Sequence, residues 1–287
     1  MFLSSFVDLS LCHFILNGFN FFRNSQYCSI PATFHSNKTV LLFLRSKYYS
    51  VQKTILVKKR TFAVDIDGTI TENGGGRIHL DALEALRRLT NMGHDVIYVT
   101  GRSSVEAYLL SVFGGTKKIA VGENGGCIAL DSDDHLLLGD IKECKNAFEV
   151  IKKNIDGVVE KPVFPRMTEV VLERTFDLDF ARKILSEQNI DVKLSDSQYA
   201  FHINSPGIDK GTGFSKIMDK FSISSDDVIA IGDSATDVPL FKVAKTSIAL
   251  GNASEDVKSE ATMTVSANAG DGVLEALDKL APKLSEI

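Results

Sequence analysis

The sequence of 287 residues predicts an α/β protein with a Rossmann-like, doubly wound parallel sheet as its core and a small α+β domain inserted into that core. Three observations predict this fold class. Strand-like and helix-like segments alternate from Thr61 onward, the order then changes to a hairpin, helices and paired strands, and the first alternation resumes after Gly207. We therefore expect residues 61–124 and 207–287 to form the core and residues 125–206 to form the inserted domain.

The first part of the expected core alternates three strands with two helices. TFAVDI, which begins at Thr61, has the unbroken apolar character of a buried strand. Leucines at positions 80, 83, 86 and 89 have the spacing of one helix face, and Gly93 suits the C-cap. HDVIYVT is then a second strand, SSVEAYLLSVFGG a second helix and KKIAV a third strand. This βαβ order is typical of a parallel sheet with helices on both faces.

The inserted segment and the second part of the core differ in their order of elements. CIALDSDDHLLLG is typical of a hairpin, and a helix over residues 140–155, strand TEVVLER, helix DLDFARKILSEQN and strands DVKLS and YAFHIN follow it. After Gly207, helix KGTGFSKIMDKF leads to strands DVIAIGD, TSIAL and TMTVS, each with a helix behind it. The sequence thus predicts that the parallel sheet is completed after the insertion.

Composition excludes some classes of partner. The net charge of −5 provides no basic surface for nucleic acid. The four cysteines have no paired spacing of the kind that binds a metal, which favours a reduced, cytoplasmic setting.

The first 60 residues differ from the rest of the chain. Their formal charge is +7, so the remaining 227 residues carry −12. Their apolar stretch Leu9–Phe22 is interrupted by polar residues and is shorter than the roughly 20 apolar residues of a membrane span. No positively charged segment of the kind found in signal peptides precedes it. We expect a poorly structured extension that results from an over-early start site, with a weak membrane-surface anchor as the second hypothesis and no stable membrane insertion.

Polar residues close the predicted strands of the core. Ligands bind at the carboxyl ends of the strands in parallel α/β sheets, so these residues should meet at one rim. The rim would collect four carboxylates, a hydroxyl, an amide and a lysine: Asp65, Asp67, Thr100, Lys210, Asp233, Asp237 and Asn252. Arg102, next to this set, has no predicted role beyond a surface salt bridge.

This set of side chains predicts phosphoryl chemistry. Crowded carboxylates repel one another unless a cation joins them, and a few carboxylates with water suit Mg²⁺. A metal, a lysine and a strand-end hydroxyl can together hold a phosphoryl group, and an aspartate can attack its phosphorus.

Four motifs, DIDGT, VTGR, Lys210 and GDSATD, occur in the order found in the haloacid dehalogenase superfamily of phosphohydrolases. The chain resembles this family from Phe62 to about the C-terminus. The insertion resembles the C2-type cap of the family. The motif GENGG (Gly122–Gly126), where the cap would begin, strengthens the resemblance to the branch that contains archaeal phosphoglycolate phosphatases and sugar-phosphate phosphatases. The resemblance implies that Asp65 is the nucleophile that forms an aspartyl phosphate, and that Asp67 is the general acid and base.

The resemblance also implies the binding roles. The strand-end pair Thr100-Gly101 and Lys210 would bind the phosphoryl oxygens. Mg²⁺ would be bound by Asp65, the backbone carbonyl of Asp67 and Asp233. Asp237 would be a further ligand or would support the ligands, and Asn252 would support them.

Substrate selection must come from the inserted domain. Arg166, in the turn-like EKPVFPRMTE with Lys161, could bind the carboxylate of a small substrate such as 2-phosphoglycolate. A sugar-phosphate phosphatase, a phosphomutase and a phosphoacceptor signalling domain remain alternatives. In each case the expected partner is a small phosphorylated metabolite or phosphoryl donor, and a homodimer is possible.

Overall fold

The computed structural model describes residues 58–72, 76–197 and 199–285. The expected N-terminal extension lies outside the described residues up to position 57, so its predictions stay untested. Strand β1 begins at Thr61, as the sequence predicts.

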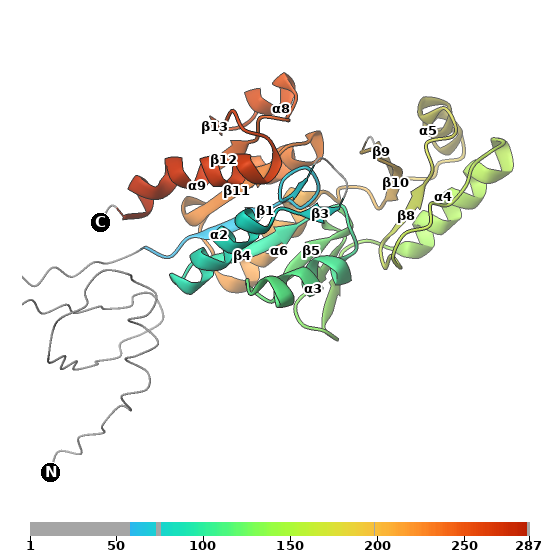
Figure 1. The fold of residues 1–287 in the computed structure, drawn as a ribbon. Coiled ribbons are helices and arrows are strands. Elements are labelled where there is room, and N and C mark those ends of the chain that lie inside the picture. Colours follow the sequence, from blue (N-terminus) through green and yellow to red (C-terminus); the bar gives the residue numbers. More distant parts are fainter. Residues whose placement is uncertain (1–57, 73–75, 198, 286–287) are drawn as a thin grey trace, which may run out of the picture. The chain divides into compact units, whose positions relative to one another are not determined.

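An eight-stranded sheet forms the centre of the described chain (Figure 1). Its order is β13-β12-β11-β1-β4-β5-β6-β7, and neighbours from β13 to β5 run parallel. The strands are β1 (Thr61–Val64), β4 (Asp95–Val99), β5 (Ala120–Gly122), β6 (Cys127–Ala129), β7 (His135–Leu137), β11 (Val228–Gly232), β12 (Thr246–Ala249) and β13 (Met263–Thr264). All residues of β1 are buried, because the sheet is covered on both faces.

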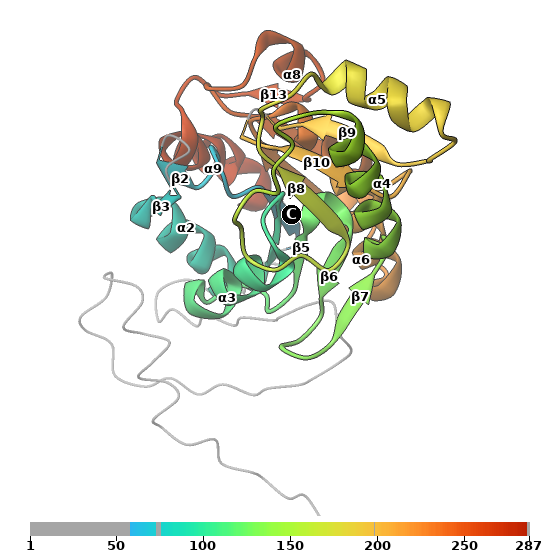
Figure 2. The same cartoon turned by 90° about the vertical axis from the view of Figure 1, so that its right-hand side faces the viewer.

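Helices pack on both faces of this sheet (Figures 1 and 2). Successive side chains of β1 point to opposite faces, so Phe62 and Val64 join one apolar cluster and Ala63 joins another. The first cluster is closed by α2 (Leu80–Asn91), α3 (Ser104–Gly114) and α9 (Ala269–Ser285). The second is closed by α6 (Lys210–Phe221), α7 (Val238–Val243) and α8 (Glu255–Ser259). The predicted α/β class with a doubly wound sheet is confirmed.

A second, three-stranded antiparallel sheet lies within the inserted segment. Its order is β8 (Glu169–Leu172), β10 (Phe201–Asn204) and β9 (Lys193–Asp196). Helices α4 (Ile141–Asn154) and α5 (Leu178–Glu187) pack on one face and form a separate apolar cluster with Leu172, Phe201 and Ile203. By the alternation of side chains, Glu169, His202 and Asn204 belong to the opposite face.

Strands β6 and β7 belong to the large sheet, whereas the sequence pattern assigned their residues to the inserted segment. β6 pairs antiparallel with β5, so that Val121 lies opposite Ile128, and β7 continues the sheet. A hairpin has the same alternation whichever sheet it joins, and antiparallel edge strands on parallel sheets are common. The division into domains stays a prediction, with strand pairing placing residues 127–137 in the core.

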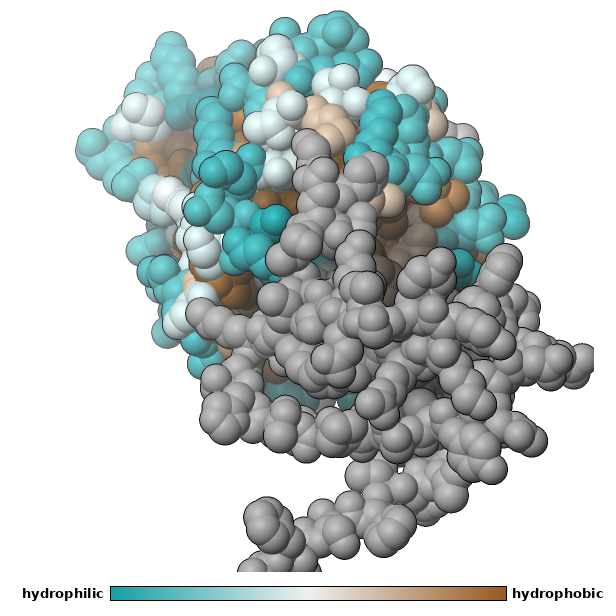
Figure 3. All heavy atoms as spheres, turned by 90° about the vertical axis from the view of Figure 1, so that its left-hand side faces the viewer, coloured by the Kyte–Doolittle hydropathy of each residue, from teal (hydrophilic) through white to brown (hydrophobic). Residues whose placement is uncertain are grey.

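A short hairpin of β2 (Thr71–Glu72) and β3 (Arg77–Ile78) was not predicted, because two-residue strands have no measurable periodicity. Of the helices in the described residues, none combines the length and the apolar character that a membrane crossing requires. Figure 3 shows one face of the molecule, where most of the coloured residues in view are hydrophilic and hydrophobic residues appear between them.

Candidate active site

Asp65 lies directly after β1, at the carboxyl end of the central strand. Its backbone N–H donates to the carbonyl of Ile231 at 3.0 Å, which fixes the residue between β1 and β11. The residue is only 3% exposed. Its Oδ1 accepts a hydrogen bond from Lys210 Nζ at 2.6 Å and its Oδ2 accepts one from Thr69 Oγ1 at 3.3 Å. The carboxylate is therefore held from two sides at the rim of the sheet.

Lys210 is the first residue of α6 and connects two strand ends. Its Nζ lies 2.6 Å from Asp65 Oδ1 and 2.6 Å from Asp237 Oδ1. Burial alone would lower the pKa of the Lys210 ammonium, but Asp237 and Asp65 outweigh burial and raise that pKa. The lysine that the sequence predicts therefore stays charged in this buried position.

Asp237 ends the 3₁₀ turn η3 (Ala235–Asp237) and orders the loop after β11. Its Oδ2 accepts three hydrogen bonds, from Asp233 N at 3.1 Å, Ser234 N at 2.9 Å and Ser234 Oγ at 2.9 Å. With Oδ1 bound to Lys210, both oxygens are occupied. This geometry favours a role for Asp237 in holding Lys210 and the Asp233 loop in place.

Asp233 is held by two polar side chains. Its Oδ1 accepts from Thr69 Oγ1 at 3.2 Å and its Oδ2 accepts from Asn252 Nδ2 at 2.7 Å. Asn252 also donates to the carbonyl of Gly68 at 2.9 Å. A Cβ on Gly68, whose φ is +78°, would lie 2.3 Å from Asp233 Oδ2, so only glycine fits here. Thr69 had no predicted role, although it stands in the DIDGT motif.

The carboxylates of Asp65, Asp233 and Asp237 could together hold a metal ion. Oxygens from the three lie within 4.8 Å of one another. Burial raises the pKa of the Asp65 carboxyl well above its usual range, Lys210 opposes this, and Asp237 and Asp233 add to it. Burial and Asp237 raise the pKa of the Asp233 carboxyl to about 7. Hard oxygen donors that repel one another fit a divalent cation, which would offset this repulsion.

Asp67 pairs with Arg102. Arg102 Nε donates to Asp67 Oδ2 and Arg102 Nη2 donates to Asp67 Oδ1, both at 2.7 Å. The Asp67 side chain is 39% exposed, unlike the buried Asp65. The two acids of DIDGT therefore occupy different environments. The sequence predicted no more than a surface salt bridge for Arg102 and could not name Asp67 as its partner, because the pairing joins two strand ends through side-chain geometry alone.

Thr100 and Gly101 close β4 beside this pair. Thr100 is buried, and its Oγ1 accepts from Arg102 N at 3.1 Å. The carbonyl of Gly101 accepts from Arg166 Nη1 at 2.7 Å, so the structure brings Arg166 to the loop after β4. Arg166 Nη1 also donates to Glu169 Oε1 at 2.9 Å, and this carboxylate balances its charge. Arg166 Nε is buried and has no hydrogen-bond partner among the described residues.

A polar cluster that the sequence did not predict surrounds Glu169. Its Oε2 accepts from Asn204 Nδ2 at 2.9 Å and from Asn124 Nδ2 at 3.3 Å, and lies 3.1 Å from His202 Nδ1. Burial would raise the pKa of the Glu169 carboxyl, but His202, Arg166 and Asn204 outweigh burial and lower it. Asn124 belongs to the 3₁₀ turn η1 (Glu123–Gly125) after β5, so the cluster links this turn to the inserted sheet. The period-two alternation of β10, which places His202 and Asn204 on one face, was the available signal.

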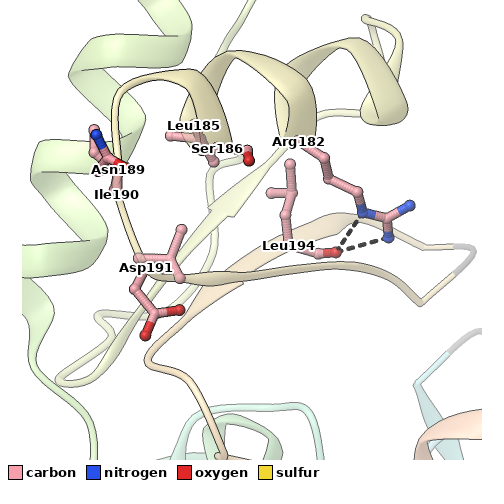
Figure 4. Close-up of a pocket in the computed structure, with 8 residues that line it drawn as sticks. Arg182, Leu185, Ser186, Asn189, Ile190, Asp191 and Leu194 are labelled. Carbon is pink, nitrogen blue, oxygen red and sulfur yellow. Dashed lines mark hydrogen bonds between the residues drawn. The ribbon is translucent and has the colours of Figure 1, made fainter.

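A surface pocket between α5 and β9 lies apart from these residues. Arg182 Nε and Nη2 donate to the carbonyl of Leu194 at 3.1 and 2.7 Å beside it (Figure 4). None of the residues that line this pocket is a predicted site residue.

Comparisons with known proteins agree with the motifs. A model of haloacid dehalogenase-like hydrolases matches residues 62–157 and 151–277. A phosphoglycolate phosphatase of Nitrosopumilus maritimus is 84% identical over 231 residues, which are 80% of this chain and 100% of the relative. A phosphoglycolate phosphatase of Methanosarcina mazei is 35% identical over 225 residues, which are 78% of this chain and 97% of the relative.

Solved structures share the fold. A crystal structure from Thermoplasma acidophilum superposes with a TM-score of 0.69 at 22% identity, covering 78% of this chain and 98% of that one. A sugar phosphatase of haloacid dehalogenase subclass IIB superposes with a TM-score of 0.62 at 19% identity, covering 78% of this chain and 99% of that one. The family model, the close relatives and the rim that holds Asp65 and Lys210 agree: the chain belongs to the haloacid dehalogenase-like hydrolases.

Proposed function

We propose that the protein is a Mg²⁺-dependent phosphoglycolate phosphatase, which converts 2-phosphoglycolate and water to glycolate and inorganic phosphate. The observation that carries the chemistry is the buried Lys210 ammonium, 2.6 Å from both Asp65 and Asp237, beside the carboxylate of Asp233. The relative that is 84% identical and named phosphoglycolate phosphatase supports the substrate.

The first step is attack by an Asp65 carboxylate oxygen on the phosphorus of the substrate. The bond between phosphorus and the leaving oxygen breaks as Asp67 donates a proton to that oxygen, and glycolate departs. In the second step Asp67 takes a proton from a water molecule, whose oxygen attacks the phosphorus of the aspartyl phosphate. The acyl-phosphate bond breaks, inorganic phosphate leaves and Asp65 is regenerated. Lys210 and the hydroxyl of Thr100 bind phosphoryl oxygens in both steps, with the backbone at Gly101.

The residues present fit Mg²⁺. Asp65, Asp233 and the backbone carbonyl of Asp67 would hold the ion, Asn252 would orient Asp233, and Asp237 would hold the loop or complete the ligands. When bound, Mg²⁺ supplies positive charge that offsets the negative charge of the carboxylates and of the phosphoryl group. The raised pKa values of Asp65 and Asp233 support this assignment, because an uncompensated acidic site binds protons in place of a cation.

Substrate selection is assigned to Arg166. Its guanidinium contacts the carbonyl of Gly101, beside the proposed phosphoryl site, and its buried Nε is free of protein partners in the described part of the chain. The pairing with Glu169 reduces the charge available to a substrate carboxylate. A broad sugar-phosphate phosphatase is therefore the alternative, and a phosphomutase is less favoured. The free, buried thiols of Cys127 and Cys144 support a reducing, cytoplasmic location, and a homodimer stays a prediction.

The test compares kcat/KM for 2-phosphoglycolate with that for glucose 6-phosphate and mannose 6-phosphate, in wild type and in Arg166→Ala. We expect wild type to prefer 2-phosphoglycolate and Arg166→Ala to lose that preference. Equal or better use of the hexose phosphates by wild type would reject the substrate. Asp65→Asn should reduce all hydrolysis to near background, and substantial turnover by that variant would reject the nucleophile.

A further inference from the structure

The contact with Arg102 fixes the orientation of the Asp67 carboxylate. Two N–H groups of one planar guanidinium meet the two oxygens of one carboxylate, each at 2.7 Å. Such a paired contact fixes the rotation of the carboxylate as well as its position. The Asp67 side chain is 39% exposed, and among the described residues its carboxylate accepts hydrogen bonds from Arg102. The buried Asp65, in contrast, is held by Lys210 and Thr69. The orientation of the Asp67 carboxylate therefore depends on Arg102.

Arg102 is itself held by the start of α3. Its remaining terminal nitrogen, Nη1, donates to Glu106 Oε1 at 3.0 Å. The other oxygen of Glu106 accepts from the backbone N–H and the hydroxyl of Ser103, both at 3.1 Å, in the capping box of the helix. The backbone of Arg102 is also fixed, since its N–H donates to Thr100 Oγ1 and its carbonyl accepts from Glu123 N at 2.7 Å. A chain of hydrogen bonds thus connects the capping box of α3, through Glu106 and Arg102, to Asp67.

We propose that Arg102 is a positioning residue for proton transfer, which holds the Asp67 carboxylate in the orientation that reaches the leaving oxygen and the attacking water. Glu106 serves as the anchor that fixes the guanidinium. This inference rests on the proposed role of Asp67 as general acid and base. It assigns to Arg102 no contact with the phosphoryl group or with the rest of the substrate.

Loss of the Arg102 contact should slow the reaction, because proton transfer requires precise placement of the Asp67 carboxylate. General acid–base catalysis contributes about 10²- to 10⁴-fold to a rate, and a misplacement of about 1 Å can cost about 10²-fold. Without Arg102, the exposed Asp67 side chain would sample several rotamers. We therefore expect Arg102→Ala to lower kcat for 2-phosphoglycolate about 30- to 100-fold, with KM changed less than about threefold. The kcat of Arg102→Lys should lie between that of wild type and that of Arg102→Ala, because an ammonium cannot make the paired contact.

The experiment uses two substrates that differ in their need for a proton. Alkoxide leaving groups require protonation, whereas p-nitrophenolate leaves without it. Rapid mixing of Arg102→Ala with p-nitrophenyl phosphate and Mg²⁺ should release about one equivalent of p-nitrophenolate per active site in a burst, followed by slow turnover as the second step fails. With 2-phosphoglycolate the same variant should show no burst of glycolate.

The second measurement is a double-mutant cycle with Asp67→Asn. If Arg102 acts through Asp67, Arg102→Ala should cost less than about threefold in the Asp67→Asn background. Glu106→Gln provides a second variant if Arg102→Ala does not fold, and should lower kcat in the same direction. Arg182→Ala is the matched control, because this arginine also makes paired bonds to one partner, the carbonyl of Leu194 (Figure 4). Arg182 also forms an ion pair with Asp179. The Arg182→Ala variant should retain wild-type kinetics.

Three results would overturn the inference. The first is a rise in KM for 2-phosphoglycolate at unchanged kcat, which would make Arg102 a substrate-binding residue. The second is an equal cost of Arg102→Ala with and without the Asp67 carboxylate, and the third is a wild-type kcat of Arg102→Ala. If Asp65→Asn is inactive while Arg102→Ala has wild-type kcat, the positioning role fails and the proposed function stands. If Asp65→Asn turns over, the proposed function itself fails.

Discussion

Replacing Lys210 by methionine tests whether the buried ion pairs of the site are as tight as the structure has them. Lys210 is only 2% exposed, and its ammonium lies 2.6 Å from an oxygen of Asp65 and 2.6 Å from an oxygen of Asp237. Methionine keeps much of the side-chain length but leaves two buried carboxylates without their partner. Removing one member of a buried ion pair costs about 3–5 kcal/mol of unfolding free energy. At about 2–4 °C for each kcal/mol in a protein of this size, the melting temperature should fall by roughly 6–20 °C.

The assay is thermal unfolding followed by circular dichroism at pH 7.5 in EDTA. Lys245→Met is the control, because Lys245 pairs with Asp226 at 2.8 Å but is two-thirds exposed, and exposed pairs contribute only about 0–1 kcal/mol. The deficit of Lys210→Met should shrink as the pH falls from about 8 to 5. Burial raises the pKa of the Asp65 carboxyl above its unfolded value, and loss of the opposing Lys210 charge should raise it further, so the folded variant binds a proton as the pH falls and gains stability. A melting temperature of Lys210→Met within 2 °C of wild type at pH 7.5 would refute the ion-pair assignment.

Two further predictions concern stability. In wild-type protein without Mg²⁺, the melting temperature should fall as the pH rises from about 5 to 8, because the folded-state pKa of Asp233, about 7, lies above its ordinary value of 3.8 and the proton that stabilises the folded state is released over this range. Saturating Mg²⁺ should flatten this dependence, and an equally steep one with and without Mg²⁺ would contradict a metal at this carboxylate. Glu123→Gln should lose about 1–3 kcal/mol in urea unfolding, because both carboxylate oxygens of Glu123 accept from Met167 N, and the NH₂ group that replaces one of them cannot accept. The exposed Glu187→Gln is its control, and equal stabilities of the two variants would show that the contacts of Glu123 are not needed.

The meeting of the polar site residues at one rim could be predicted because they follow parallel strands of the same sheet. Asp65 and Asp233 follow neighbouring strands, β1 and β11, and Lys210 opens the helix that packs beside them. Residues at the carboxyl ends of parallel strands must meet, so their positions in the sequence were sufficient. The supporting amide of Asn252 was found by the same rule.

Pairings between side chains could not be predicted in this way. Arg102 and Asp67 are 35 residues apart, and their strand ends offer several possible partners. Arg166 and Glu169 have a spacing of three, but only the structure shows that their side chains are 9% and 0% exposed and that Glu169 also contacts His202. The hairpin after Gly126 illustrates the same limit for strands, because alternation defines a strand and not its neighbour.

A hydrogen bond connects the two ends of the inserted segment. The backbone N–H of Asp140, which precedes α4, donates to Ser205 Oγ at 2.8 Å, although 65 residues separate the two. The apolar cluster of α4, α5 and the small sheet is contained between these ends. Any replacement segment with equally close ends could be joined at the same two residues without stretching β7 or α6, and chain length between joined ends costs little additional closure entropy. We therefore expect that a different segment joined at Asp140 and Ser205 would leave the strands that carry Asp65 and Asp233 in place.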